Sequence, residues 1–193
     1  GEIYLETGRE EKAVRLLLKA WEESGEWRSA NSLGNGYLKM GQEDKAFRYF
    51  AEAESISDHP TVARNLAETH EKLGQSDEAR RWYETALTRF NEQLAQGGSR
   101  ADVLKGRSFC LAKLDRFEEA IAEIEEALEP NSNESSFLFR AAQVYFLAER
   151  RQQAFSYLRR AVKAGLSPDE IGSDFVFQPH LDDPELREIL EGN

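Results

Sequence analysis

The chain has 193 residues, of which 40% are apolar and 32% charged, and its net charge is −11. This composition is too apolar for a disordered chain and too charged for a membrane protein. A surplus of acids also argues against nucleic-acid binding, because proteins that neutralise phosphates usually carry a surplus of bases. The single cysteine, Cys110, cannot form a disulfide framework, so we expect a reducing compartment, the cytoplasm, while a periplasmic location is also compatible.

The elements expected along the chain repeat with a period of about 34 residues. In each repeat an alanine opens an apolar helical pattern, a bulky apolar residue follows four positions later, and a second alanine follows after seven. Positions spaced in this way share one helix face, so each repeat has a helix whose inner stripe is small, large and small. The anchor alanines are Ala13, Ala46, Ala79, Ala120 and Ala154.

A second helical pattern precedes each of these helices. A large residue stands nine positions before the anchor alanine, and a small residue stands twelve before it, which lets two helix backbones approach. Five positions before the anchor come Gly8, Gly41 and Gly74, which suit a left-handed residue at a helix end. Asp115 and Glu149 at this position of the last two repeats are poorer helix enders, so we expect differently shaped turns there.

This helix–turn–helix pattern resembles the tetratricopeptide repeat (TPR). The segments "LGNGYLKMGQEDKAFRYFAEAESI" and "LAETHEKLGQSDEARRWYETAL" carry nearly the whole motif, and "LDRFEEAIAEIEEALEPN" carries its second helix. Arg107 departs from the motif, which usually has leucine there. The resemblance implies an all-α fold, a right-handed α-solenoid of about four and a half repeats with the first one truncated. We assign 1–166 to this solenoid and 167–193 to C-terminal capping helices.

The third and fourth anchor alanines are farther apart than the others, which indicates an insertion near 90–99. We expect the second helix of the third repeat to be about two turns too long, until Gly97–Ser99 ends it. The insertion is either simply tolerated or forms a bend or partner contact.

The two ends of the chain differ. The first repeat begins in mid-helix, so we expect the chain to continue upstream of Gly1 from an uncapped apolar end. In the tail, Pro168 and Pro184 open short helices, and Phe175 and Phe177 are expected to pack against the fifth repeat. The tail resembles the closing segment of many bacterial TPR proteins, which implies a bacterial origin.

We predict no catalytic, cofactor or metal site. The histidines His59, His70 and His180 lack the spacing of metal ligands. Gly34 and Gly36 form a Gly-x-Gly, but they lie inside an expected helix with no strand before it, so they are not a phosphate loop. Gly34 recurs as a small packing residue, whereas the repeat pattern assigns Gly36 no role.

The resemblance implies that the first helices line a concave groove, the surface on which solenoids bind extended partners. The positions that we project into it carry six bases and three acids, a net +3, although the whole chain carries −11. We expect asparagines to bond peptide backbone, bases to select acidic residues, and phenylalanines to anchor an apolar one unless the tail folds over them. The candidate peptide-binding residues are Arg28, Asn31, Asn35, Lys39, Arg64, Asn65, Lys72, Lys105, Phe109, Lys113, Phe139, Arg140, Gln143 and Phe146.

The sequence therefore predicts a non-catalytic module that binds a protein or peptide with acidic and apolar residues, without nucleic acid and without membrane insertion. A clamp for a terminal carboxylate is disfavoured, because Asp102 and Gly106 stand where such TPR domains have lysine and arginine. Two alternatives remain. The uncapped N-terminal end could mediate self-association, or the repeats could be a regulatory or sensory domain of a larger bacterial signalling or transcription-regulating protein.

Overall fold

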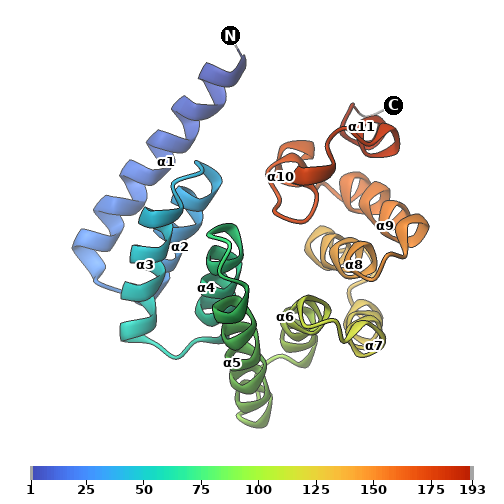
Figure 1. Cartoon of the computed structure of the whole chain (residues 1–193), viewed down its shortest axis with the longest axis horizontal. Helices are drawn as coiled ribbons and strands as arrows, with labels where there is room; N and C mark the ends of the chain where they lie inside the picture. The colour runs from blue at the N-terminus through green and yellow to red at the C-terminus, as the bar shows by residue number, and fades with distance from the viewer. Residues whose placement is uncertain (1, 192–193) are drawn as a thin grey trace. The chain divides into compact units, whose positions relative to one another are not determined.

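The structure, a computed structural model, describes residues 2–191, and their side chains from residue 11 onward. Every regular element in this range is a helix, and short connections join successive helices (Figure 1). The elements are α1 (Glu2–Ser24), α2 (Trp27–Lys39), α3 (Glu43–Ile56), α4 (Pro60–Lys72), α5 (Ser76–Ala95), α6 (Arg100–Lys113), α7 (Phe117–Leu128), α8 (Ser135–Leu147), α9 (Arg151–Lys163), α10 (Pro168–Gly172), the 3-10 helix η1 (Gln178–His180) and α11 (Pro184–Glu191). No helix in the described range is long and apolar enough to cross a membrane.

The helices gather into two compact units, Gly1–Arg89 (unit 1) and Phe90–Asn193 (unit 2), and the boundary between them falls inside α5. In unit 1, α2 packs against α1, α3 and α4. The small–large–small stripe of α3 is completely buried, since Ala46, Phe50 and Ala53 each have 0% exposure. The pattern of alanines in the sequence thus marks the core.

Gly34 lies on α2 against this stripe. A Cβ at Gly34 would lie 2.4 Å from a carbon of the Phe50 ring, so any side chain there would displace the ring from the core. The prediction that Gly34 is a helix-packing residue is confirmed.

Gly36 serves a different helix contact. A Cβ at Gly36 would come 2.9 Å from Cγ2 of Val14, and Val14 is 6% exposed in the same core. The two glycines of "GNG" therefore allow α2 to approach α3 on one side and α1 on the other.

The first repeat departs from the predicted helix–turn–helix. A single helix, α1, runs from Glu2 through Gly8 to Ser24, and the chain turns only at Gly25, whose φ is 60°. The prediction of a helix end at Gly8 is wrong. A glycine inside a helix costs only about 1 kcal/mol, so Gly8 does not by itself end α1. Gly1 and the side chain of the expected packing residue Tyr4 lie outside the described residues.

The four turns between paired helices share one shape. Gly41 and Gly74 have φ of 65° and 73°, and Asp115 and Glu149 have φ of 63° and 58°, all in the left-handed region. The residue after each of them donates its N–H to the carbonyl oxygen five residues earlier, over 2.8–2.9 Å. The prediction of differently shaped turns at Asp115 and Glu149 is therefore wrong. Packing of the helix pairs imposes the turn, although a residue with a Cβ pays about 1–2 kcal/mol for this conformation.

The helix α5 is longer than the other second helices, with 20 residues against 14 in α3, 12 in α7 and 13 in α9. The chain then turns at Gly97, whose φ is 84°. Phe90, in the added length, is 4% exposed, and a Cβ at Gly106 of α6 would lie 2.3 Å from its ring. The added turns therefore bury an aromatic ring of unit 2.

Unit 2 contains the pairs α6–α7 and α8–α9, and α6 also packs against α8. Arg107, the departure from the repeat pattern, forms an ion pair with Glu123 of α7 at 2.8 Å, and the two side chains are 21% and 17% exposed. Burial raises the pKa of Glu123, and the positive charge of Arg107 opposes that rise. An ion pair thus takes the place of an apolar contact between α6 and α7.

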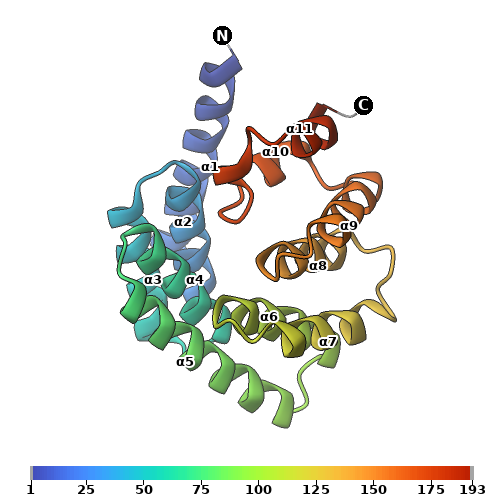
Figure 2. The ribbon, with the colours of Figure 1, turned by 45° about the vertical axis from the view of Figure 1, so that its right-hand side comes forward.

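The C-terminal residues lie over the α8–α9 pair of unit 2 (Figure 2). Ser167 begins α10 with a capping box that includes Glu170. Asp183 caps α11 and forms an ion pair with Arg151 of α9. The completely buried side chains of this segment are Ile171, Phe177 and Leu186.

Candidate functional site

In unit 1, the first helices of two successive repeats, α2 and α4, bring three of the predicted site residues together. Asn31 and Asn35 are one turn apart on α2, and Asn65 of α4 contacts both of them. Asn65 Nδ2 donates to Asn31 Oδ1 over 2.9 Å and to Asn35 Oδ1 over 3.4 Å. Its own Oδ1 accepts a hydrogen bond from Arg64 Nη2 over 3.1 Å. We call the side chains of Asn31, Asn35, Arg64, Asn65 and Glu68 the amide face of unit 1.

The three asparagines differ in how many hydrogen-bonding groups of their side-chain amides remain unused. Asn65 is 2% exposed and uses both its donors and its acceptor within the cluster, so it positions the other two. Nδ2 of Asn31 and Nδ2 of Asn35 donate to none of the described residues, and Asn35 is exposed. Two oriented amide groups therefore remain available as hydrogen-bond donors.

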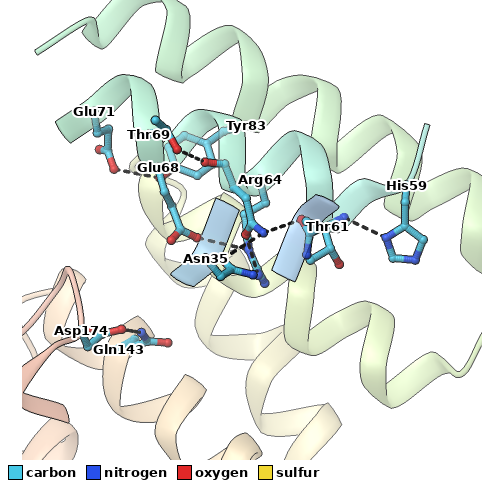
Figure 3. Close-up of polar contacts among 12 residues, drawn as sticks. Asn35, His59, Thr61, Arg64, Glu68, Thr69, Glu71, Tyr83, Gln143 and Asp174 are labelled. Carbon is cyan, nitrogen blue, oxygen red and sulfur yellow. Dashed lines mark hydrogen bonds and ion pairs between the residues drawn. The ribbon is translucent and has the colours of Figure 1, made fainter. Parts of the chain in front are cut away.

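Arg64 is already paired with an acid of its own helix. Its Nε lies 3.2 Å from Oε1 of Glu68, and the two side chains are 18% and 19% exposed. The next acid on this face, Glu71, accepts a hydrogen bond from the Tyr83 hydroxyl over 2.8 Å (Figure 3). The positive charge expected at Arg64 is therefore compensated within the chain.

An aromatic stack lies where α2 and α4 begin. The rings of Trp27 and His59 are stacked with centroids 4.3 Å apart, and the Arg28 guanidinium carbon lies 4.7 Å from the Trp27 ring centroid. His59 Nδ1 accepts a hydrogen bond from the Thr61 N–H over 3.3 Å and so caps α4 (Figure 3). Burial lowers the pKa of His59, and the charges of Arg28 and Arg64 lower it further, which favours the neutral imidazole that can accept this hydrogen bond.

Two exposed cations remain in unit 1 among the predicted site residues. Arg28 and Lys39 have no acidic partner among the described residues. Lys72 is half-buried in the last turn of α4. The stack of Trp27 on His59 was not predicted from the sequence, because nearly a whole repeat separates the two residues. The available signal was His59 directly before a proline at the first position of a helix.

The predicted residues of unit 2 lie on α6 and α8, and three of them, Phe109, Lys113 and Arg140, are in contact with one another. Phe109 is 2% exposed, with the Arg140 guanidinium carbon 4.3 Å and Lys113 Nζ 5.8 Å from its ring centroid. Lys105 Nζ lies 3.3 Å from a carboxylate oxygen of Asp102. Phe109 is therefore a core residue beneath two cations and not an exposed anchor.

The expected apolar patch of the fifth repeat is covered by the tail. The Phe177 ring lies 5.9 Å from that of Phe139 and 5.1 Å from that of Phe146, measured between centroids. The His180 ring lies 5.0 Å from that of Phe146. The alternative in which the tail folds over these phenylalanines is the one that the structure shows.

Two family models of the tetratricopeptide repeat match the chain, one over residues 58–129 and the other over residues 111–170. No curated protein matches the sequence. Among solved structures, PilW, a widely conserved type IV pilus biogenesis factor, is similar with a TM-score of 0.54 and 17% identity, covering 100% of this chain and 89% of that one. The anaphase-promoting-complex hetero-tetramer Cut9–Hcn1 gives 0.54 and 16%, covering 91% and 34%, and BtubC (BKLC) from P. vanneervenii gives 0.50 and 22%, covering 84% and 76%. At these identities the likeness establishes the fold alone.

Proposed function

The chain carries a domain of the tetratricopeptide-repeat family, and from that premise we propose that it is a non-catalytic module that binds a segment of another protein on the amide face of unit 1. The fold is all-α and built of helix–turn–helix units, and domains of this family are typically protein-interaction modules. The observation that carries the proposal is the pair of amide groups, on Asn31 and Asn35, that Asn65 orients and leaves free to donate.

Amide donors of this kind suit a peptide backbone. An extended segment presents carbonyl oxygens along its length, and an amide N–H binds them without requiring a particular side chain. Because Asn65 already fixes the Oδ1 atoms of Asn31 and Asn35, the two amides lose little freedom when a partner binds. The buried Asn65 is therefore a positioning residue, and the other two make the contact.

The charges beside the amide face favour a partner with acidic residues. Arg64 is compensated by Glu68, so the cations that select acids are the exposed Arg28 and Lys39. The half-buried ring of Trp27 supplies an apolar contact next to Arg28. The expected partner is an extended segment with acidic residues and one apolar anchor.

The test uses a display library of random peptides selected on the purified chain. We expect the enriched peptides to be acidic, and the double substitution Arg28→Glu with Lys39→Glu to weaken their binding about tenfold or more. The matched control is Arg48→Glu with Arg81→Glu, which makes the same charge change at exposed positions of the second helices α3 and α5.

Asn35→Ala provides the second arm of this test. It removes a free donor from an exposed side chain, so it should weaken binding while the helical content measured by circular dichroism stays unchanged. Equal loss of binding in the control pair, or full binding by Asn35→Ala, would reject the amide face as the site.

Self-association remains a second candidate, and one observation favours it. Leu16 on α1 is 63% exposed, an unusual surface position for a large apolar side chain. Sedimentation over a range of concentrations separates the two candidates, because binding of a foreign segment alone leaves the chain monomeric. A bacterial, cytoplasmic setting and a role within a larger regulatory or sensory protein are also proposals, supported by the resemblance of the tail to those of bacterial TPR proteins.

A further inference from the structure

The residues Asp174–His180, which we call the tail segment, occupy the first-helix face of unit 2. They contact Lys113 on α6 and Phe139, Gln143 and Phe146 on α8, four of the residues predicted to bind a partner. Gln143 stands at the repeat position that Asn35 occupies in unit 1, eleven residues before the anchor alanine. The tail segment therefore lies where the repeat would place a bound peptide.

Two contacts of the tail segment are specific in their chemistry. Gln143 Nε2 donates to Asp174 Oδ2 over 2.7 Å (Figure 3), and the other oxygen of Asp174 accepts the Val176 N–H over 3.0 Å. Phe177 is completely buried against the rings of Phe139 and Phe146. The face thus accepts one carboxylate and one aromatic ring at fixed positions.

A third contact lies between these two in sequence. Lys113 Nζ lies 4.5 Å from the centroid of the Phe175 ring, a cation–π distance. Val176, the next residue, contributes its N–H to the turn that Asp174 caps. Because the Val176 side chain is only 6% exposed, the occupied face recognises an acid, an aromatic residue, a buried aliphatic residue and a second aromatic residue, in that order.

The tail segment leaves one buried polar atom of the face without a partner. Gln143 is 4% exposed, and its Oε1 accepts no hydrogen bond from any described residue. The orientation of the amide is fixed by chemistry, because the carboxylate of Asp174 can only accept and so requires the nitrogen of Gln143 to face it. A segment that also brought an N–H to Gln143 Oε1 would satisfy the face better than the tail segment does.

The tail segment is held between two separate attachments. On its N-terminal side, α10 has its own capping box and a completely buried Ile171. On its C-terminal side, α11 packs on α9 and is tied to it by the ion pairs of Arg151 with Asp183 and of Arg159 with Glu185. The segment between them can leave the face while both attachments stay in place.

We propose that this face of unit 2 is a binding site for a protein segment of the form acid–aromatic–aliphatic–aromatic, and that the chain's own Asp174–Phe177 fills it as a built-in competitor. A partner segment of the same chemistry binds by displacing the tail segment and gains the hydrogen bond to Gln143 Oε1. This proposal is independent of the amide face of unit 1 and concerns different residues.

The test uses a fluorescent synthetic peptide with the sequence of residues 173–182, added to the full chain. We expect it to bind the Phe177→Ala chain about tenfold tighter than the unmodified chain, because the internal competitor is weakened. Adding Gln143→Ala to the Phe177→Ala chain should abolish this gain. A control peptide with alanine in place of the acid and of the second aromatic residue should bind neither chain.

A second weakened chain keeps the test decisive if Phe177→Ala loses helical content. Asp174→Ala removes the carboxylate but leaves the buried ring, and it should show the same gain in peptide affinity. The proposal is overturned if the folded tail variants bind the peptide no better than the unmodified chain. It is equally overturned if Gln143→Ala leaves the gain intact.

Discussion

Each unit has an amide side chain at the same position of the repeat, and this side chain is exposed in unit 1 and buried in unit 2. Asn35 in unit 1 is exposed, and its Nδ2 has no partner among the described residues, whereas Gln143 in unit 2 is 4% exposed and donates to Asp174. The repeat sets where each amide side chain stands. The residues packed around it decide whether that amide is free to bind, and in unit 2 the tail segment occupies the face.

The tryptophans allow the two units to be followed separately. Trp21, Trp27 and Trp82 are the three tryptophans of the chain, and all belong to unit 1. Their fluorescence reports on unit 1, whereas far-ultraviolet circular dichroism reports on the helices of both units. The following changes are designed to act on one unit and spare the other.

The largest effect is expected from Phe177→Ala. Removing a completely buried aromatic ring should destabilise unit 2 by about 3–5 kcal/mol. In a urea titration, the loss of helix seen by circular dichroism should begin at lower urea, while the midpoint of tryptophan fluorescence stays in place. Equal shifts of both signals would mean that the two units unfold as one.

Asn65→Ala should have the converse effect, confined to unit 1. It removes the donor to Asn31 and Asn35 and the acceptor of Arg64 Nη2, which should cost about 1–3 kcal/mol. The fluorescence midpoint should shift, whereas Asn35→Ala, at the exposed position, should change stability by less than about 0.5 kcal/mol. Similar effects of the two substitutions would contradict the positioning role of Asn65.

The turns of the two units should respond with opposite signs. Glu149→Gly removes the backbone strain of a residue with a Cβ in the left-handed conformation, so it should stabilise unit 2 by about 1 kcal/mol. Gly74→Ala introduces the same strain into the equivalent turn of unit 1 and should destabilise that unit by a similar amount. Thermal unfolding followed by both signals checks the pair. No gain from Glu149→Gly would show that its side chain compensates the strain.

The smallest effect is expected from pH. The pKa of His59 is lowered from its ordinary 6.5 by burial and by Arg28 and Arg64, so its contribution to stability is complete above 6.5 and declines as the pH falls through the lowered value. The pKa of Asp183 is lowered from 3.8, chiefly by its hydrogen bond to Arg151, so the attachment of α11 should weaken only in stronger acid. Fluorescence of unit 1 should therefore change first in an acid titration, and His59→Gln should remove that early change.

Much of the fold could be predicted from the sequence, because small residues recur at the buried positions of each repeat. The spacing of alanines located the buried stripe around Phe50, and the position of Gly34 located a close contact between α2 and α3. The turns at Asp115 and Glu149 could not be predicted, since local propensity disfavours a conformation that helix packing imposes.

The candidate site was predictable only in part. The repeat position placed Asn31, Asn35 and Asn65 near one another. Only the structure shows that the side-chain N–H groups of Asn65 are both used in orienting the other two asparagines. Charge counting assigned acid selection to Arg64, which its neighbour Glu68 neutralises. The contact of Asp174 with Gln143 joins a repeat position to a residue of the tail, and Asp174 lies outside the repeat pattern, so no periodic signal could reveal the contact.

The absence of a side chain at Gly36 of α2 also affects the register of α1 relative to α2. Val14 rests over the one residue of this face that has no Cβ, and the residues one turn away on either side are Ser32 and Met40. A slide of α1 along α2 by one turn, about 5.4 Å, would bring Val14 against a side chain instead of a bare backbone. Gly36 therefore favours one register of α1 along α2, and a side chain at this position would push Val14 out of that register.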